Sequence, residues 1–232
     1  MAGMSDHRGI AYVQHFFPGT GTTYDHIVNL CTLGCDHWWK RQILAKIPAG
    51  ATRIMDQACG TGILTFKIAQ RFPRARIVGV DVTEEYLAIA QEKARRLQVQ
   101  NVEFILGRAE EVLLEEGFDC LTSSYLAKYA ELDILIPAAR AMLRPGGIVI
   151  MHDFTYPSPW LAPLWELYFR LLQTLGARQY PQWKRVFDDL PGLMRETAWV
   201  SGLVSSLEEN RFGDIAVKNL TCGTAAIVTA KR

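Results

Sequence analysis

Residues 52–66 read TRIMDQACGTGILTF and decide the fold. The run TRIMD has the character of a short strand, and apolar residues recur at helical spacing after Gly62. Between them, small residues crowd together behind Asp56, although such residues lose more backbone entropy on folding. They are kept where a ligand must approach the main chain, so the stretch predicts a strand, a ligand-binding loop and a helix.

The same alternation continues to about residue 153. Further strand-like runs are ARIVGVD, NVEFIL, FDCLTSS and GIVIMHD, and the helical patterns between the strands cover 61–72, 83–97, 109–114 and 131–143. Alternating strands and helices predict βαβ units and a parallel sheet. The unbroken apolar runs IVGV and IVIM are typical of strands buried on both faces. The Pro145-Gly146-Gly147 turn is expected to end the fourth helix and open the fifth strand.

The flanking segments differ from this core. The first fifty residues are aromatic and helical in pattern, and their aromatic side chains are expected to close the ligand pocket: Tyr12, Phe16, Phe17 and Tyr24. Two helices are expected after the core, one ending near residue 175 and one from about 191 to 207, before a hairpin that turns at Cys222-Gly223. We expect one domain over 1–232, made of a helical cap (1–50), a cofactor-binding core (51–155), a helical substrate or lid region (156–210) and a terminal hairpin (211–232).

Composition excludes several classes of function. The 232 residues carry a formal net charge of +1, so no basic excess points to nucleic acid. The five cysteines are irregularly spaced, which disfavours a disulfide framework and favours a reducing cytoplasm. No apolar run is long enough to span a membrane, and the N-terminus lacks the apolar core of a signal peptide. The sequence leaves open whether the chain forms a homodimer.

The loop sequence limits the classes of ligand that can bind there. It lacks the third glycine of a dinucleotide fingerprint and the Gly-Lys-Ser/Thr of a P-loop, so diphosphate recognition is disfavoured. A ligand that joins an adenosine to a charged amino acid, without a phosphate, remains possible. Asp81 ends the second strand, where an acid accepts both ribose hydroxyls. Arg108, Ala109 and Glu110 follow the third strand, where an adenine would lie.

The motifs DQACGTG, VGVDVTEEYLAIAQEKA, GRAEEV, FDCLTSSY and MLRPGGIVIMHDF together resemble class I S-adenosylmethionine-dependent methyltransferases. The segments YDHIVNLCTLGCDHWWKRQIL and RFGDIAVKNLTCGTAAIV extend the resemblance to the C-methyltransferase family of ubiquinone and menaquinone biosynthesis. The resemblance implies an α/β fold with a doubly wound, mostly parallel seven-stranded sheet of Rossmann-like type. An N-terminal helical lid, a helical insertion after strand five and a C-terminal antiparallel hairpin complete it.

The resemblance also implies the cofactor, S-adenosylmethionine, and its binding residues: Asp56, Ala58, Gly60, Thr61, Gly62, Asp81, Val82, Arg108, Ala109 and Ser124. The chain departs from the family after strand four. The family carries Gly-Leu-Arg-Asn there, with the Arg and Asn at the substrate, whereas Lys128 and Tyr129 stand at those two places here.

Methyl transfer needs alignment, exclusion of water and in some cases removal of a proton. The candidates for proton removal are Lys128, Tyr129, His152, Asp153 and Tyr24. A hydrogen-bonded strand end is an equal interpretation of the pair after strand five, His152 and Asp153.

Two further groups have a structural and a functional interpretation. Cys31 and Cys35 are four residues apart, but buried thiols are favoured over a soft-metal or arsenic site, and no metal is expected. Trp160, Trp165, Tyr168 and Phe169 are typical of a core helix and also of an apolar pocket wall. Their helix would also suit brief peripheral contact with a membrane surface, although it lacks a dense basic face.

The leading hypothesis is methyl transfer to a small apolar acceptor that is aromatic or quinone-like. Methylation of oxygen, nitrogen or sulfur in another metabolite stays open. So does a non-catalytic S-adenosylmethionine-binding protein that regulates a partner. A nicotinamide-dependent oxidoreductase is disfavoured by the missing third glycine.

Overall fold

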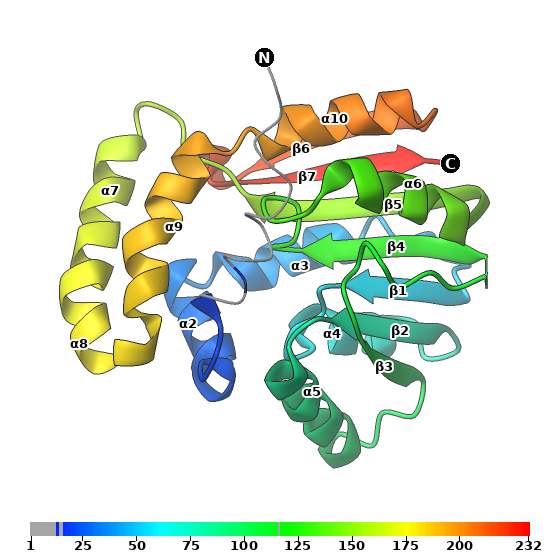
Figure 1. The fold of residues 1–232 in the computed structure, drawn as a ribbon, viewed down its shortest axis with the longest axis horizontal. Coiled ribbons are helices and arrows are strands. Elements are labelled where there is room, and N and C mark those ends of the chain that lie inside the picture. The colour runs from blue at the N-terminus through cyan, green and yellow to red at the C-terminus, as the bar shows by residue number, and fades with distance from the viewer. Residues whose placement is uncertain (1–12, 14–15, 116) are drawn as a thin grey trace.

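A seven-stranded sheet forms the centre of this computed structural model, which describes residues 13, 16–115 and 117–232 (Figure 1). Its strands are β1 (Arg53–Gln57), β2 (Arg76–Asp81), β3 (Val102–Leu106), β4 (Phe118–Ser124), β5 (Leu143–Phe154), β6 (Gly213–Leu220) and β7 (Ala225–Lys231). They lie in the order β3-β2-β1-β4-β5-β7-β6. The first five strands of that order run parallel, and β7 is antiparallel to both β5 and β6. The predicted fold class is therefore confirmed.

Helices cover both faces and one end of this sheet (Figure 1). The α-helices are α2 (Tyr24–Cys31), α3 (Cys35–Leu44), α4 (Ile63–Arg71), α5 (Glu84–Arg96), α6 (Leu132–Met142), α7 (Ala162–Leu171), α8 (Ala177–Gln179), α9 (Lys184–Glu196) and α10 (Trp199–Glu209). Short 3₁₀ segments are η1 (Gly21–Thr23), η3 (Pro181–Trp183) and η4 (Thr221–Gly223), and a π-helical turn, η2 (Leu172–Gly176), joins α7 to α8.

The strand order reverses between β1 and β4. From β1 the chain proceeds outward through β2 to β3, and then returns to place β4 and β5 on the other side of β1. In open α/β sheets, ligands bind outside the carboxyl ends of the strands at such a reversal. The glycine-rich loop follows β1 and therefore lies at this point.

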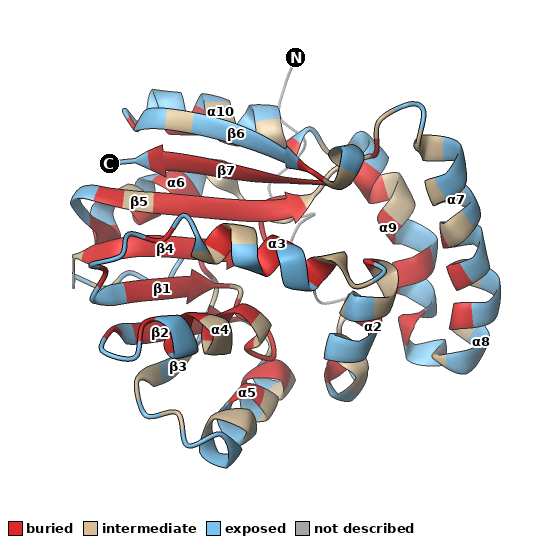
Figure 2. Ribbon diagram, turned by 180° about the vertical axis from the view of Figure 1, so that it is seen from behind, coloured by how far each residue is buried: buried red, intermediate tan, exposed pale blue. Residues whose placement is uncertain are grey.

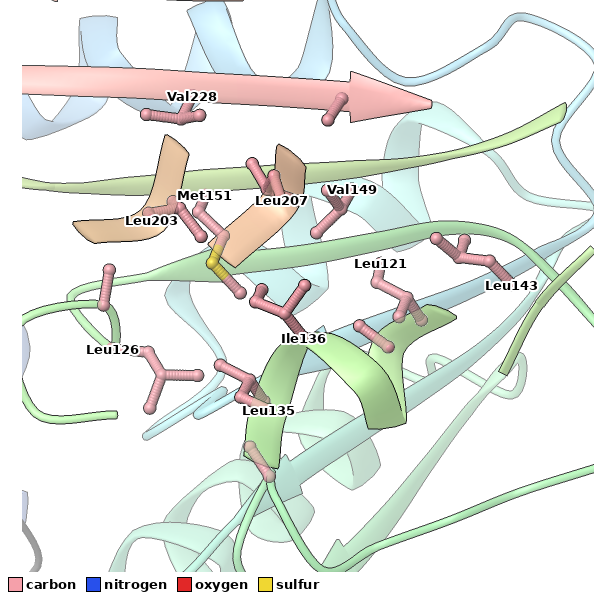
Figure 3. Packing of buried hydrophobic residues seen from close by; sticks show 14 of the residues in the cluster. Leu121, Leu126, Leu135, Ile136, Leu143, Val149, Met151, Leu203, Leu207 and Val228 are labelled. Atoms are coloured by element: carbon pink, nitrogen blue, oxygen red, sulfur yellow. The ribbon is translucent and has the colours of Figure 1, made fainter. Parts of the chain in front are cut away.

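The two faces of the sheet bury separate apolar clusters. On one face, side chains of β4 and β5 pack against α6 and α10, as Figure 3 shows for Leu121, Met151, Leu135 and Leu203. On the other face, Cys120 and its neighbours pack against α3 and α4. Successive residues of a strand point to opposite faces, so strands covered on both sides must be apolar throughout, and the central strands in Figure 2 are buried along their length.

A third cluster joins the N-terminal helices to the insertion after β5. Phe16 and Ile27 pack there with Phe169, Trp183 and Phe187 from the segment between α7 and α9. This packing places α2, α7 and α9 together beyond the carboxyl end of β4 and β5 (Figure 1).

Three local expectations are wrong. Residues 109–114 were expected to be helical but form a turn and an irregular segment. The side chains of Arg108 and Glu110 hydrogen-bond to Glu131, just before α6, and these contacts hold the segment in its irregular course. The stretch 191–207 is two helices, α9 and α10, with Pro191 inside α9. The Pro145 turn does not end α6, which stops at Met142, but lies within β5 as an irregular start. The terminal hairpin turns at 221–223 as predicted.

Candidate active site

The loop after β1 brings the main chain of Gly60 to the wall of a pocket. Gly60 and Gly62 have φ angles of +57° and +86°, a conformation that side chains with a Cβ rarely adopt. A Cβ on Gly62 would lie 2.4 Å from the ring of Phe66, whereas the nearest atoms to a Cβ on Gly60 are ring carbons of Tyr86 and Tyr24, 3.8 and 3.9 Å away. A ligand can therefore approach the backbone at Gly60.

Asp81 ties this loop to the end of β2. One carboxylate oxygen accepts the N–H of Gly60 at 2.7 Å, and the other accepts the N–H of Thr83 at 2.8 Å. Burial raises the pKa of Asp81, and these two backbone hydrogen bonds oppose part of that increase. The acid predicted from the end of the second strand thus lies directly beside the loop.

A pocket with an empty volume of about 1060 Å³, including its mouth, extends from the loop to the helical layer. It is lined by nine residues predicted as site residues: Tyr24, Ala58, Gly60, Asp81, Val82, Arg108, Ser124, Lys128 and Tyr129. Its far wall is apolar and includes Phe17, Ile27, Val186 and Leu190. The pocket therefore joins the expected cofactor side to an apolar chamber.

Four predicted cofactor residues do not line this pocket. The carboxylate of Asp56 lies beneath the loop, accepts the hydroxyls of two threonines at 2.6 and 3.1 Å, and has its pKa raised to about 6 by burial. Thr61 donates its hydroxyl to Asp25 at 2.5 Å. Gly62 lines a separate surface groove, and Ala109 packs into the apolar core.

The segment before α2 covers the loop side of the pocket. The N–H groups of Gly19 and Gly21 each donate to the carboxylate of Glu85 at 2.9 Å, and the hydroxyls of Thr20 and Tyr86 are 2.6 Å apart. The ring of Phe17 lies 6.0 Å from that of Tyr86. Phe17 of this segment and Tyr24 at the start of α2 line the pocket, and Tyr12 lies outside the described residues.

Tyr24 is part of this cover. Its ring centroid is 5.0 Å from that of Tyr86 and 5.9 Å from that of Trp183. Burial, followed by the charges of Tyr86 and Asp81, raises the pKa of Tyr24 well above 10. The phenol therefore stays protonated at neutral pH and is a poor proton acceptor.

Lys128 and Asp153 form a buried ion pair. The ammonium lies 2.5 Å from the carboxylate, and the two side chains are 2% and 0% exposed. Asp153 also accepts the main-chain N–H groups of Lys128 and Phe154. Burial lowers the pKa of Lys128, and Asp153 opposes that decrease. The ammonium also lies 4.4 Å from the ring centroid of Tyr129.

His152 is buried behind the pocket. Its Nδ1 lies 2.9 Å from the hydroxyl of Ser124, which in turn accepts a hydrogen bond from Lys40 at 2.5 Å. Burial, with the charges of Lys40 and Lys128, holds the pKa of His152 well below 6.5, so the ring is neutral at pH 7. The other ring nitrogen, Nε2, is buried and has no hydrogen-bond partner among the described residues.

Three polar residues of this region were not predicted as site residues. Lys40 forms a buried 2.9 Å ion pair with Asp36, and Asp36 accepts the hydroxyl of Tyr125 at 2.5 Å. Tyr125 has a φ of 72° and stacks on Phe154, with ring centroids 4.5 Å apart. The acid and lysine four residues apart are visible in the sequence, but such a pair is normally a solvated helix surface.

The two cysteines differ in their surroundings, and Cys35 packs against the apolar cluster that includes α3 and α4. Cys31 lines the pocket, and burial raises the pKa of its thiol to about 12. Across residues 13, 16–115 and 117–232, no three His, Cys, Asp or Glu side chains are grouped to hold a metal ion. Over the same residues, no helix has the length and apolar character needed to cross a membrane.

A family model described as a methyltransferase domain matches residues 49–190. The chain belongs to this methyltransferase family. The match covers the sheet from β1 to β5, the glycine-rich loop and the insertion through most of α9. The prediction of an S-adenosylmethionine-dependent methyltransferase is confirmed.

Individual relatives agree with this assignment. A demethylmenaquinone methyltransferase from Staphylococcus aureus is 23% identical over 220 residues, which cover 93% of this chain and 90% of that protein. A geranyl diphosphate C-methyltransferase from Streptomyces coelicolor, solved with S-adenosyl-L-homocysteine, has a TM-score of 0.63 at 13% identity and covers 84% and 78% of the two chains. An S-adenosylmethionine-dependent methyltransferase from Aquifex aeolicus has a TM-score of 0.60 at 15% identity over 83% and 88%.

Proposed function

We propose that this methyltransferase acts on a small, apolar, ring-containing acceptor of quinone-like type. The observation that carries the proposal is one continuous pocket that begins at Gly60 and Asp81 and ends in an apolar wall of Ile27, Val186 and Leu190. Such a wall favours a flat or prenylated ring over a charged metabolite, because burying a charge without a partner is costly.

The residues fit S-adenosylmethionine. A small pocket beside the loop is lined by Lys40, Asp56, Ala58 and Ser124, and so offers both signs of charge to an amino-acid end. Asp81 uses one lone pair on each oxygen to accept the N–H groups of Gly60 and Thr83. A carboxylate has about four acceptor sites, so both ribose hydroxyls can be added. Val82 is exposed and would lie against the adenine.

The donor supplies an electrophilic methyl group on a sulfonium and a neutral thioether leaving group. The protein's part is to hold the acceptor in line and to exclude water. Phe17, Tyr24, Tyr86 and Trp183 line one side of the pocket and serve as this cover.

Two groups have the placement to handle charge on the acceptor. Lys128 and Tyr129 both line the pocket. In this proposal the Lys128 ammonium stabilises negative charge on a ring oxygen and the Tyr129 hydroxyl orients a ring substituent. Neutral His152 does not line the pocket, whereas Ser124, whose hydroxyl contacts His152 Nδ1, does. In this proposal a proton from the acceptor therefore reaches His152 only through the Ser124 hydroxyl. Asp153 fixes Lys128 and is a positioning residue.

The 23% identity to a demethylmenaquinone methyltransferase supports a quinone-like acceptor. Lys128 and Tyr129, which stand where the family has Arg and Asn, support an acceptor that is related to the usual quinone precursor but distinct from it. Lys keeps the positive charge of Arg but lacks its planar fork, and here the Lys128 ammonium is already held by Asp153. Bidentate gripping of a ring oxygen is therefore lost.

The test is an acceptor screen with methyl-labelled S-adenosylmethionine. Demethylated naphthoquinols and benzoquinols, simple phenols, and small amines and thiols are offered, and products are identified by mass spectrometry. We expect ring-containing apolar acceptors to be methylated and Tyr129→Phe to lower turnover, while Tyr180→Phe, whose hydroxyl contacts His26 instead, does not. Methylation of polar amines or thiols alone would refute the proposed acceptor class.

A further inference from the structure

One helix exposes a continuous apolar stripe. Among the large apolar side chains that the described residues expose, five lie on or just before the segment formed by α7 and η2: Trp160, Leu164, Leu167, Leu171 and Leu175. They are between 49% and 71% exposed. The four leucines follow one another at spacings of three or four residues, so they share one face of the helix.

The opposite face of the same helix is buried. Phe169 and Leu172 pack into the cluster that contains Trp183 and Leu190, and these two residues line the acceptor pocket. Figure 2 shows α7 at the rim of the molecule, on the side away from the sheet. Core packing therefore explains the inner face of the helix but leaves the leucine stripe unexplained, and exposed patches of this kind mark interaction sites.

Charge around the stripe points to its partner. Residues 160–189 contain four basic side chains, Arg170, Arg178, Lys184 and Arg185, and three acids, Glu166, Asp188 and Asp189. All four basic residues are exposed; Lys184 is paired with Asp188, and Glu166 is paired with Arg195 of α9. A local positive excess on a protein of net charge +1 is complementary to an anionic surface.

We propose that the outer face of α7 and η2 docks this methyltransferase onto an anionic lipid bilayer. The leucines enter the boundary between headgroups and acyl chains, Trp160 lies at the headgroup level, and the arginines bind lipid phosphates. A second copy of this chain fits less well, because a stable protein interface uses about 20–30 residues on each partner. The stripe is one helix wide. The proposal goes beyond the transfer reaction and does not depend on which acceptor is methylated.

The test is co-sedimentation of the full chain with phosphatidylcholine vesicles that contain or lack phosphatidylglycerol. We expect binding to the anionic vesicles that weakens with salt. The double variant Leu167→Gln/Leu171→Gln should lower the partition coefficient by more than about tenfold, because each buried leucine contributes substantially to transfer. Arg170→Gln/Arg178→Gln should lower it by about fivefold for each charge.

The matched control is Leu97→Gln/Leu113→Gln, which removes two equally exposed leucines away from this helix. Urea unfolding and S-adenosyl-L-homocysteine affinity verify that every variant is folded. Wild-type protein that stays in the supernatant, or equal binding by the leucine variant and the control, overturns the proposal. A dimer in sedimentation velocity that only the leucine variant dissociates, without vesicle binding, overturns it in favour of a second copy.

Discussion

Replacing Lys128 by Met removes one half of the buried ion pair with Asp153. The Met side chain fills a similar volume, so the change isolates the ammonium. What remains is a carboxylate that is fully buried and still accepts two main-chain N–H groups. Removing one partner of a buried pair typically costs about 3–5 kcal/mol, because the other charge is left uncompensated.

The chain contains a matched pair at the surface. Lys184 and Asp188 are also 2.5 Å apart, but their side chains are 63% and 38% exposed. Exposed pairs at this helical spacing contribute only about 0.3–0.5 kcal/mol. Lys184→Met should therefore hardly change the free energy of unfolding. Because both ion pairs have the same N–O distance, the difference in destabilisation between Lys128→Met and Lys184→Met measures the effect of burial.

The assay is urea unfolding of the wild type, the two Met variants and the double variant Lys128→Met/Asp153→Asn. Asparagine removes the stranded charge and keeps one acceptor oxygen, so the double variant should recover at least about 1.5 kcal/mol relative to Lys128→Met. Turnover should stay low in this folded double variant, with S-adenosyl-L-homocysteine affinity unchanged, if Lys128 acts on the acceptor.

Two results would refute this reasoning. Equal stability of the Lys128→Met and Lys184→Met proteins would show that the pair is not buried as described. Full turnover in the folded double variant would remove Lys128 from the transfer step and leave it a structural residue.

Burial raises the pKa of Asp56 from 3.8 to about 6, so its contribution to stability is present below pH ~4 and is lost as pH rises through about 6. The unfolding free energy of the wild type minus that of Asp56→Asn should fall by about 2 kcal/mol from pH 4 to 7, and a flat difference would contradict the raised pKa. Asp81→Ala should weaken S-adenosyl-L-homocysteine binding by about 1.5–3 kcal/mol in calorimetric titration, and unchanged affinity in a folded variant would move the ribose site elsewhere. Glu85→Ala frees residues 19–21 and should lower turnover, whereas Glu84→Ala, at an exposed neighbouring position, should not; equal turnover would remove the cap from the reaction.

The sequence alone determined the core of this fold and its loop. Strand runs such as IVGV are apolar throughout because the strand is covered on both faces, and that pattern is local. Gly60 and Gly62 could be recognised because small residues between a strand and a helix indicate a ligand close to the main chain, and both have a positive φ in the structure. Asp81 could be placed because the last residue of a parallel strand must lie at the sheet's carboxyl edge.

Patterns failed where a local signal competed with distant partners. Residues 109–114 have a helical pattern, but Arg108 bonds to Glu131, in a different segment, and the stretch stays irregular. Pro191 looks like the start of a helix but lies inside α9, since the helix had already begun at Lys184. The irregular course of 109–114 and the start of α9 at Lys184 do not follow from hydrophobic periodicity, so the sequence pattern could not predict them.

Only the tertiary structure decided the polar network behind the pocket. Lys40 meets Ser124 across 84 positions of sequence, and Tyr125 meets Asp36 across 89. Nothing in the sequence distinguishes Lys40 from a solvated helix lysine, because burial of a charge depends on what packs over it. Charge pairing is a property of positions in space, whereas hydrophobic periodicity is a property of positions along the chain, and the sequence reveals only the second directly.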